Sequence, residues 1–189
     1  MIRFALTFAI VALIALICPT GFSAHAQTPI SNATSEAFYG NCLKRRDPRM
    51  SEESQTEFCA CSATQMQQSM TMEEAQTMFQ QSQEGRDMLN KMLVTVYAPC
   101  MDMPVQDIVE LECRSDPKVK ALNLKGNPSD LCYCMGKETG KWFAANGPYL
   151  IAALLKKDPN ITDPITPIME SHVLKKESFQ FLMQCANGN

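Results

Sequence analysis

Histidine and tryptophan are scarce in this 189-residue chain, which contains two histidines and one tryptophan. His25 lies in the N-terminal segment, so His172 is the only histidine in the rest of the chain. A Ser-His-Asp triad, a Cys-His pair or a multi-histidine metal site would have to use that one residue. The G-x-S-x-G, H-E-x-x-H and P-loop motifs are also missing. We therefore predict no catalytic residue, no metal ligand and no cofactor, and we interpret His172 as an ordinary helix residue.

Basic charge and strand patterns are scarce as well. The chain has 17 Lys and Arg residues against 20 Asp and Glu residues, a formal net charge of −3. No basic stripe is present, which excludes nucleic-acid binding. Apolar and polar residues do not alternate in the way that strands require, which excludes a β fold. The acidic residues are scattered, and a two-carboxylate hydrolase stays as an alternative because such pairs form in space rather than in sequence.

Long apolar runs are missing except at the N-terminus. There, residues 4–18 follow Arg3, and Pro19 and the triplet Ala24-His25-Ala26 come after them. A basic start, a short apolar run and a small-x-small exit are typical of a secretory signal. The run is shorter than the roughly 20 residues of a membrane-spanning helix. We expect residues 1–26 to be a signal peptide that is cleaved after Ala26, leaving a periplasmic or secreted chain with no transmembrane span.

Cysteines, by contrast, are abundant. Nine are present, and only Cys18 belongs to the expected signal peptide. The other eight fall into two sets with the same order: a single cysteine, then a C-x-C pair, then a lone cysteine downstream. The first set is Cys42, Cys59, Cys61 and Cys100, and the second is Cys113, Cys132, Cys134 and Cys185. Repeated order of this kind predicts an internal duplication. We expect a first helical unit over 27–103 and a second over 104–189.

An even number of cysteines in an exported chain predicts disulfides. Residues two apart on a helix point about 200° away from each other, so the two sulfurs of each C-x-C should face different helices. Two pairings then stay open. We favour Cys42–Cys61 with Cys59–Cys100, and Cys113–Cys134 with Cys132–Cys185, because these enclose the longer loop between the first two helices of each unit. The alternative exchanges the two partners within each C-x-C. A redox-active C-x-C is a third interpretation, which we disfavour because each pair has two further cysteines at matching positions.

Helix signals recur along the chain. In the first unit we expect helices over 35–46, over 51–70 with Ser51 as N-cap, from a Thr71 cap onward, and over 84–98. In the second unit we expect helices over 104–113, from a Ser129 or Asp130 cap through Phe143, over 149–157 and over 168–184. A linker over 118–128, a break at residues 146–148 and a loop over 158–167 separate them. The predicted fold is all-α, with two tandem disulfide-stapled units of about four helices each.

Methionine is frequent, with 13 residues in the chain. Four positions in a Gln-rich stretch and one short M-x-M motif stand out: Met66, Met70, Met72, Met78 and Met101-Asp102-Met103. Thioethers are soft ligands that suit Cu(I), but methionine also fills irregular gaps in helical cores and forms adaptable binding surfaces. We favour the core interpretation.

Aromatic residues gather around the expected break. Trp142, Phe143 and Tyr149 flank Gly147-Pro148, where they would either line a recognition groove or pack in the core, and we favour the core. The sequence as a whole predicts an exported, non-enzymatic helical protein that binds a protein or peptide partner. A thiol–disulfide or copper-handling protein and a hydrolase are the alternatives.

Overall fold

The chain is mostly helical in the part that its structure, a computed structural model, describes. That part comprises residues 27–122 and 124–188, so the expected signal peptide and its cleavage site after Ala26 lie outside it. Within these ranges the one β feature is an isolated bridge between Pro29 and Thr71. The all-α prediction is therefore confirmed.

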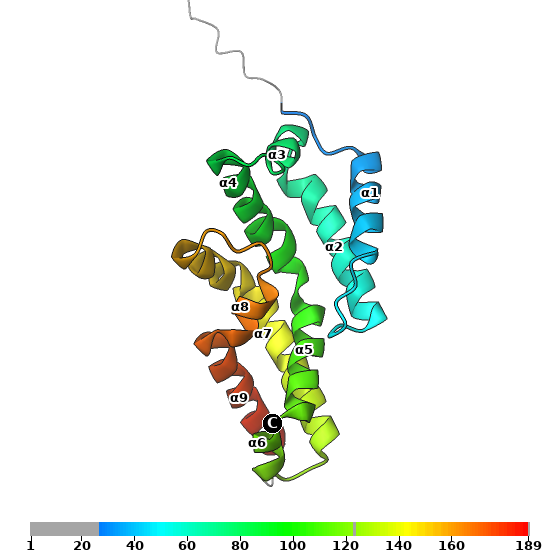
Figure 1. Cartoon of the computed structure of the whole chain (residues 1–189). Coiled ribbons are helices and arrows are strands. Elements are labelled where there is room, and N and C mark those ends of the chain that lie inside the picture. The colour runs from blue at the N-terminus through cyan, green and yellow to red at the C-terminus, as the bar shows by residue number, and fades with distance from the viewer. Residues whose placement is uncertain (1–26, 123, 189) are drawn as a thin grey trace, which may run out of the picture.

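The first half of the described chain forms an antiparallel helical hairpin followed by four shorter segments (Figure 1). These elements are α1 (Asn32–Leu43), α2 (Glu52–Ser69), α3 (Met72–Thr77), α4 (Gln83–Met92), a π-helical turn (Leu93–Tyr97) and a 3-10 turn (Ala98–Cys100). Both expected caps are present. The Ser51 hydroxyl accepts a hydrogen bond from the backbone N–H of Ser54. Thr71 and Glu74 form a reciprocal capping box, which satisfies two otherwise unpaired backbone donors.

The second half is built around one long helix. Its elements are α5 (Asp102–Ser115), α6 (Pro117–Ala121), α7 (Pro128–Lys157), α8 (Ile165–Glu170) and α9 (His172–Ala186). The pair α5–α7 has the most extensive contact between any two elements, and α7–α9 has the next. In Figure 1, α1 and α2 lie together at one end of the molecule, whereas α6 and α9 lie at the other.

The expected break at residues 146–148 is wrong, because α7 runs through it without interruption. Gly147 is there for packing: a Cβ at this position would lie 2.3 Å from a ring carbon of Phe143. Pro148 leaves the carbonyl of Ala144 without its helical partner, and Ala144 is exposed, so water can satisfy that carbonyl. The helix also begins earlier than expected, with Asn127 as its N-cap.

Two further boundaries differ from the prediction. The expected linker over 118–128 contains most of α6, which Asp116 caps and which begins at Pro117, a residue favoured at the first helical position. The expected helix over 168–184 is divided between α8 and α9 at Ser171. The Ser171 hydroxyl accepts a hydrogen bond from the backbone N–H of Leu174 and so starts a new helix.

Two glycines allow α5 and α7 to cross at close range. A Cβ at Gly136 would lie 2.6 Å from the backbone oxygen of Gln106, and a Cβ at Gly140 would lie 2.6 Å from that of Asp102. Real Cβ atoms do not approach this closely, so the crossing requires glycine at both positions. This contact fixes the relative position of the two helices that carry the middle cysteines of the chain.

The main hydrophobic core includes residues from both sides of the predicted boundary at 103/104. Leu93, Ala98 and Met101 pack in the same cluster as Val105 and Phe143. Two smaller clusters lie at the ends of the molecule, one around Met66 and Met92 and one around the Cys113–Cys132 disulfide. The division into two duplicated units stays a prediction, and the units would share one interior.

Four disulfides are present, and their order is the same in both cysteine sets. The bonds are Cys42–Cys59, Cys61–Cys100, Cys113–Cys132 and Cys134–Cys185. The pairing that we favoured, Cys42–Cys61 with Cys59–Cys100 and Cys113–Cys134 with Cys132–Cys185, is therefore wrong, and the alternative is found in both sets.

The physical reason lies in helix rotation rather than loop length. The two candidate loops that begin at Cys42 differ by two residues, which changes the chain-entropy contribution by only about 0.1 kcal/mol. Cys59 and Cys132 are almost fully buried, at 0% and 1% exposed, and each bonds to an earlier helix, Cys59 to α1 and Cys132 to α5. The second cysteine of each C-x-C points to a different side of its helix and bonds to a cysteine later in the chain.

Candidate functional site

The methionines of the Gln-rich stretch lie in or against a core cluster. Met66 and Met70 are each 4% exposed and pack with Met92, while Met72 and Met78 are partly buried against the same cluster. Their core interpretation is confirmed. Among the described residues, no group of three or more His, Cys, Asp and Glu side chains is placed to hold a metal ion.

The aromatic residues around Gly147 do not share one environment. Phe143 is fully buried, Trp142 packs partly against the main core, and Tyr149 is 79% exposed. The core interpretation is therefore confirmed for Phe143 and wrong for Tyr149, because α7 is continuous and turns Tyr149 to solvent. The three do not form a groove.

Neither the C-x-C cysteines nor His172 lies in an environment that is typical of a reactive residue. All four C-x-C cysteines are in disulfides, and Cys59 and Cys61 lie in the middle of α2 rather than at a helix start. The helix-start environment that lowers the pKa of reactive thiols is thus lacking at this pair. His172 is exposed as the first residue of α9.

A pocket of about 280 Å³ lies between α5, α6, α7, α8 and α9. Its apolar lining comes from all five helices. The lining residues are Val109, Val119, Met135, Met169, Leu174 and Leu182. Most of these side chains are buried, so the lining is part of the folded interior and does not depend on a ligand for its shape.

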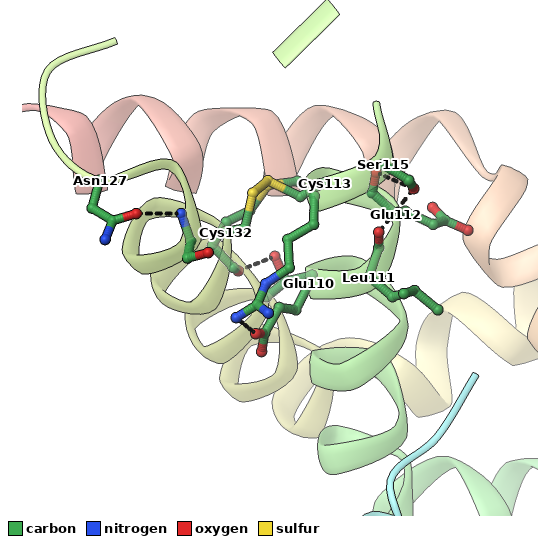
Figure 2. The surroundings of a disulfide bond; sticks show 11 residues. Glu110, Leu111, Glu112, Cys113, Ser115, Asn127 and Cys132 are labelled. Carbon is green, nitrogen blue, oxygen red and sulfur yellow. Dashed lines mark hydrogen bonds and ion pairs between the residues drawn. A yellow bond between two sulfur atoms is a disulfide. The ribbon is translucent and has the colours of Figure 1, made fainter. Parts of the chain in front are cut away.

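Two disulfides fix the walls of this pocket. Cys113–Cys132 joins α5 to α7 and itself contributes Cys113 to the lining (Figure 2). Cys134–Cys185 joins α7 to the end of α9. Covalent links on two sides limit how far the walls can separate, and the pocket is therefore largely pre-formed.

Three charged residues stand at the pocket: Glu112, Asp116 and Lys175. Figure 2 shows Glu110 and Glu112 on different sides of α5. Glu110 forms an ion pair with Arg114. Partial burial raises the pKa of Glu112 above its ordinary value, and the positive charges of Lys175 and Arg49 act in the opposite direction. Desolvation is the larger of these effects, although Glu112 is still exposed to solvent at the pocket mouth.

Ser178 adds a polar group to the otherwise apolar lining. The residue is 4% exposed and lines the pocket, and its hydroxyl makes no hydrogen bond to any described residue. The fully enclosed side-chain atoms that lack a partner are those of Ser54, Ser62 and Asn90, so the Ser178 hydroxyl is instead reachable from the space of the pocket. Phe179, the next residue of α9, is 50% exposed and also lines the pocket.

A second hollow of about 290 Å³ lies between the 47–51 segment and α5, but its charged groups are already satisfied. Arg114 pairs with Glu110, Arg49 pairs with Asp47, and Asp107 accepts a hydrogen bond from the backbone N–H of Ser51. It offers no free group to a ligand. The pocket beside Glu112 is therefore the better candidate site.

Sequence reasoning missed every residue of this pocket except its cysteine. A weak signal was present on α9, where Lys175, Ser178, Phe179 and Leu182 are spaced for one helix face. Glu112 directly precedes Cys113 and lies four residues before Asp116. Neither spacing distinguishes a pocket from a solvated helix face until the neighbouring helices are placed.

Fold and site together define a class: an all-α, disulfide-rich protein whose described part contains an apolar pocket rimmed by charged residues. Comparison of the chain with protein-family models, with curated proteins and with solved structures finds no match. Within the described residues, no helix has the length and apolar character needed to cross a membrane. Four disulfides are typical of a protein that matures in an oxidising compartment.

Proposed function

We propose that this is an exported protein that binds a protein or peptide partner, and that the pocket between α5, α7 and α9 receives an apolar side chain of that partner. The observation that carries the proposal is the pocket itself. It is open to solvent at Phe179, apolar inside and held by two disulfides.

The size of the pocket supports a side chain rather than a large cofactor. Cofactor and drug-sized ligands occupy clefts of roughly 300–1,000 Å³, and this pocket, at about 280 Å³, lies at the lower limit of that range. A half-exposed aromatic residue at the mouth is typical of an interface anchor, since aromatic residues dominate the energy of many interfaces.

The disulfides support the same proposal because they reduce the conformational entropy that the pocket loses when a partner binds. A pocket whose walls are already fixed needs little ordering when a partner binds, so more of the contact energy appears as affinity. Export would also explain why the protein has disulfides, because an oxidising compartment preserves them and they stabilise a small helical protein.

Site-specific crosslinking in the native cells tests the proposal. The photo-reactive amino acid benzoyl-phenylalanine replaces Phe179 at the pocket mouth, or Phe79, which is 81% exposed in the turn after α3, as the matched control. We expect one crosslinked protein, identified by mass spectrometry, from position 179 and none from position 79.

Filling the pocket should abolish that crosslink. Ser178→Leu fills it from inside, and Lys175→Trp covers it from an exposed position that the fold tolerates. Thermal unfolding shows whether each variant is folded. The proposal is wrong if position 179 captures nothing, or if the product persists in a folded variant with the pocket filled.

A further inference from the structure

We infer that the partner segment carries a lysine or arginine next to its apolar anchor, and that this cation meets the carboxylate of Glu112 while the anchor occupies the pocket. The inference rests on the proposed function and adds to it the chemistry of the partner. It depends on the charges around the pocket and on the hydroxyl of Ser178.

The charged residues at the pocket mouth carry a net negative charge. Glu112 and Asp116 contribute two carboxylates one helical turn apart, and Lys175 contributes one ammonium group. Among the described residues, neither carboxylate takes part in any of the five ion pairs. Asp116 accepts a hydrogen bond from the backbone N–H of Lys118 as the cap of α6, which leaves Glu112 without a polar partner of its own.

The surroundings of Glu112 favour a cation brought by a ligand. Partial burial penalises its charged form, and the two nearby positive groups, Lys175 on α9 and Arg49 before α2, do not approach closely enough to pair with it. Arg49 is occupied by Asp47. Glu112 is exposed at the pocket mouth, so a cation that arrives with the partner can reach its carboxylate, and the negative balance of charge there favours that cation.

The hydroxyl of Ser178 indicates that the ligand is a peptide rather than a hydrocarbon. A purely apolar ligand would cover this hydroxyl without giving it a hydrogen bond, which costs free energy. A backbone amide or carbonyl next to the anchor side chain can pair with it. Apolar lining, hydroxyl and carboxylate thus match the three parts of an apolar–basic dipeptide.

Three capped tetrapeptides test the inference on the full mature protein. They are acetyl-Gly-Phe-Lys-Gly-amide and the same peptide with norleucine or glutamate in place of lysine. Binding is followed by NMR of the methionine methyl groups, because Met135 and Met169 line the pocket and report on its occupation.

The expected result is that the lysine peptide shifts both methyl signals and binds about fivefold more tightly than the norleucine peptide, with the glutamate peptide weakest. Glu112→Gln should remove most of the preference for lysine. Glu110→Gln is the matched control: Glu110 lies on the same helix but outside the pocket, so the preference should persist.

Acid provides an independent readout. Lowering the pH from 7 to 4 should reduce the preference for lysine in the wild type, because Glu112 then takes up a proton, whereas Glu112→Gln should change little. Asp116, the other carboxylate at the pocket, is common to both proteins, so the difference between them isolates Glu112.

The outcomes separate the two proposals. If the norleucine peptide binds as tightly as the lysine peptide, the inference about charge is overturned and the proposed function stands. If the preference for lysine survives in Glu112→Gln, Glu112 is not the partner of the cation and the inference fails. If none of the three peptides shifts the Met135 and Met169 signals, both proposals fail.

Discussion

Replacing Gly140 with alanine tests the close crossing of α5 and α7 on which the geometry of the pocket depends. In a helix with free space around it, Gly→Ala stabilises by about 1 kcal/mol, because alanine has the higher helix propensity. At Gly140 the new Cβ would lie 2.6 Å from the backbone oxygen of Asp102 and 3.2 Å from the Cβ of Gln106. The first of these atoms belongs to a helix backbone and cannot rotate away.

Relief of that contact requires α5 and α7 to separate. Overpacking of this kind costs about 1–3 kcal/mol and more when backbone must move, which exceeds the gain in helix propensity. We therefore expect Gly140→Ala to lower the free energy of unfolding by about 1–2 kcal/mol. The assay is equilibrium unfolding in urea of the disulfide-intact protein.

Gly40→Ala is the matched control. Gly40 lies within α1, and a Cβ there would meet no atom within 4 Å. The same change should raise the free energy of unfolding by about 0.5–1 kcal/mol. The same Gly→Ala substitution should therefore lower the free energy of unfolding at Gly140 and raise it at Gly40. If both variants are stabilised to a similar degree, the close crossing of α5 and α7 is refuted.

Three further predictions concern separate parts of the fold. Phe143→Ala should lower the free energy of unfolding in urea by about 3–5 kcal/mol, since the ring is fully buried in the main core; a loss below about 1 kcal/mol would contradict that placement. Thr71→Ala should cost about 1 kcal/mol by removing a capping box, and an unchanged Tm would count against the cap. Asp47→Asn should lower Tm more at pH 7 than at pH 2. The hydrogen bond from Arg49 lowers the pKa of Asp47, so its contribution exists above the ordinary pKa of 3.8 and is lost as pH falls through the lowered value. Equal effects at both pH values would contradict this.

Local signals in the sequence predicted much of the fold, because their physics is local. Ser51 and Thr71 cap helices wherever the following residues are helical, and both caps are found. The cysteine count and the expected export indicated disulfides, and all eight cysteines form them. These features require no knowledge of what lies opposite in space.

Features that depend on a neighbouring element could not be predicted in this way. A glycine next to a proline is typical of a helix break. Gly147 nevertheless lies inside a helix, where its lack of a side chain leaves room for the ring of Phe143. Gly136 and Gly140 carry no local signal for the approach of another backbone. The cysteine partners follow from which side of each helix faces its neighbour, and loop length was the wrong criterion because its energetic effect is small.

The candidate pocket was missed for the same reason. Glu112 and Ser178 are 66 positions apart in the sequence numbering and come together only because α9 packs beside α5 and α7. Each is an ordinary residue on its own helix. A functional role appears only when the buried hydroxyl, the carboxylate and the apolar lining are seen around one space.

Disulfide connectivity in protein collected from outside the cytoplasm tests the account most directly, since the pocket walls and the stability of the fold both depend on it. Stepwise partial reduction with alkylation, followed by tandem mass spectrometry, resolves the two partners within each C-x-C. We predict Cys42–Cys59, Cys61–Cys100, Cys113–Cys132 and Cys134–Cys185, with no alkylatable thiol before reduction. Free thiols at these positions, or a bond from Cys113 to Cys134, would contradict the scaffold and the pocket built on it.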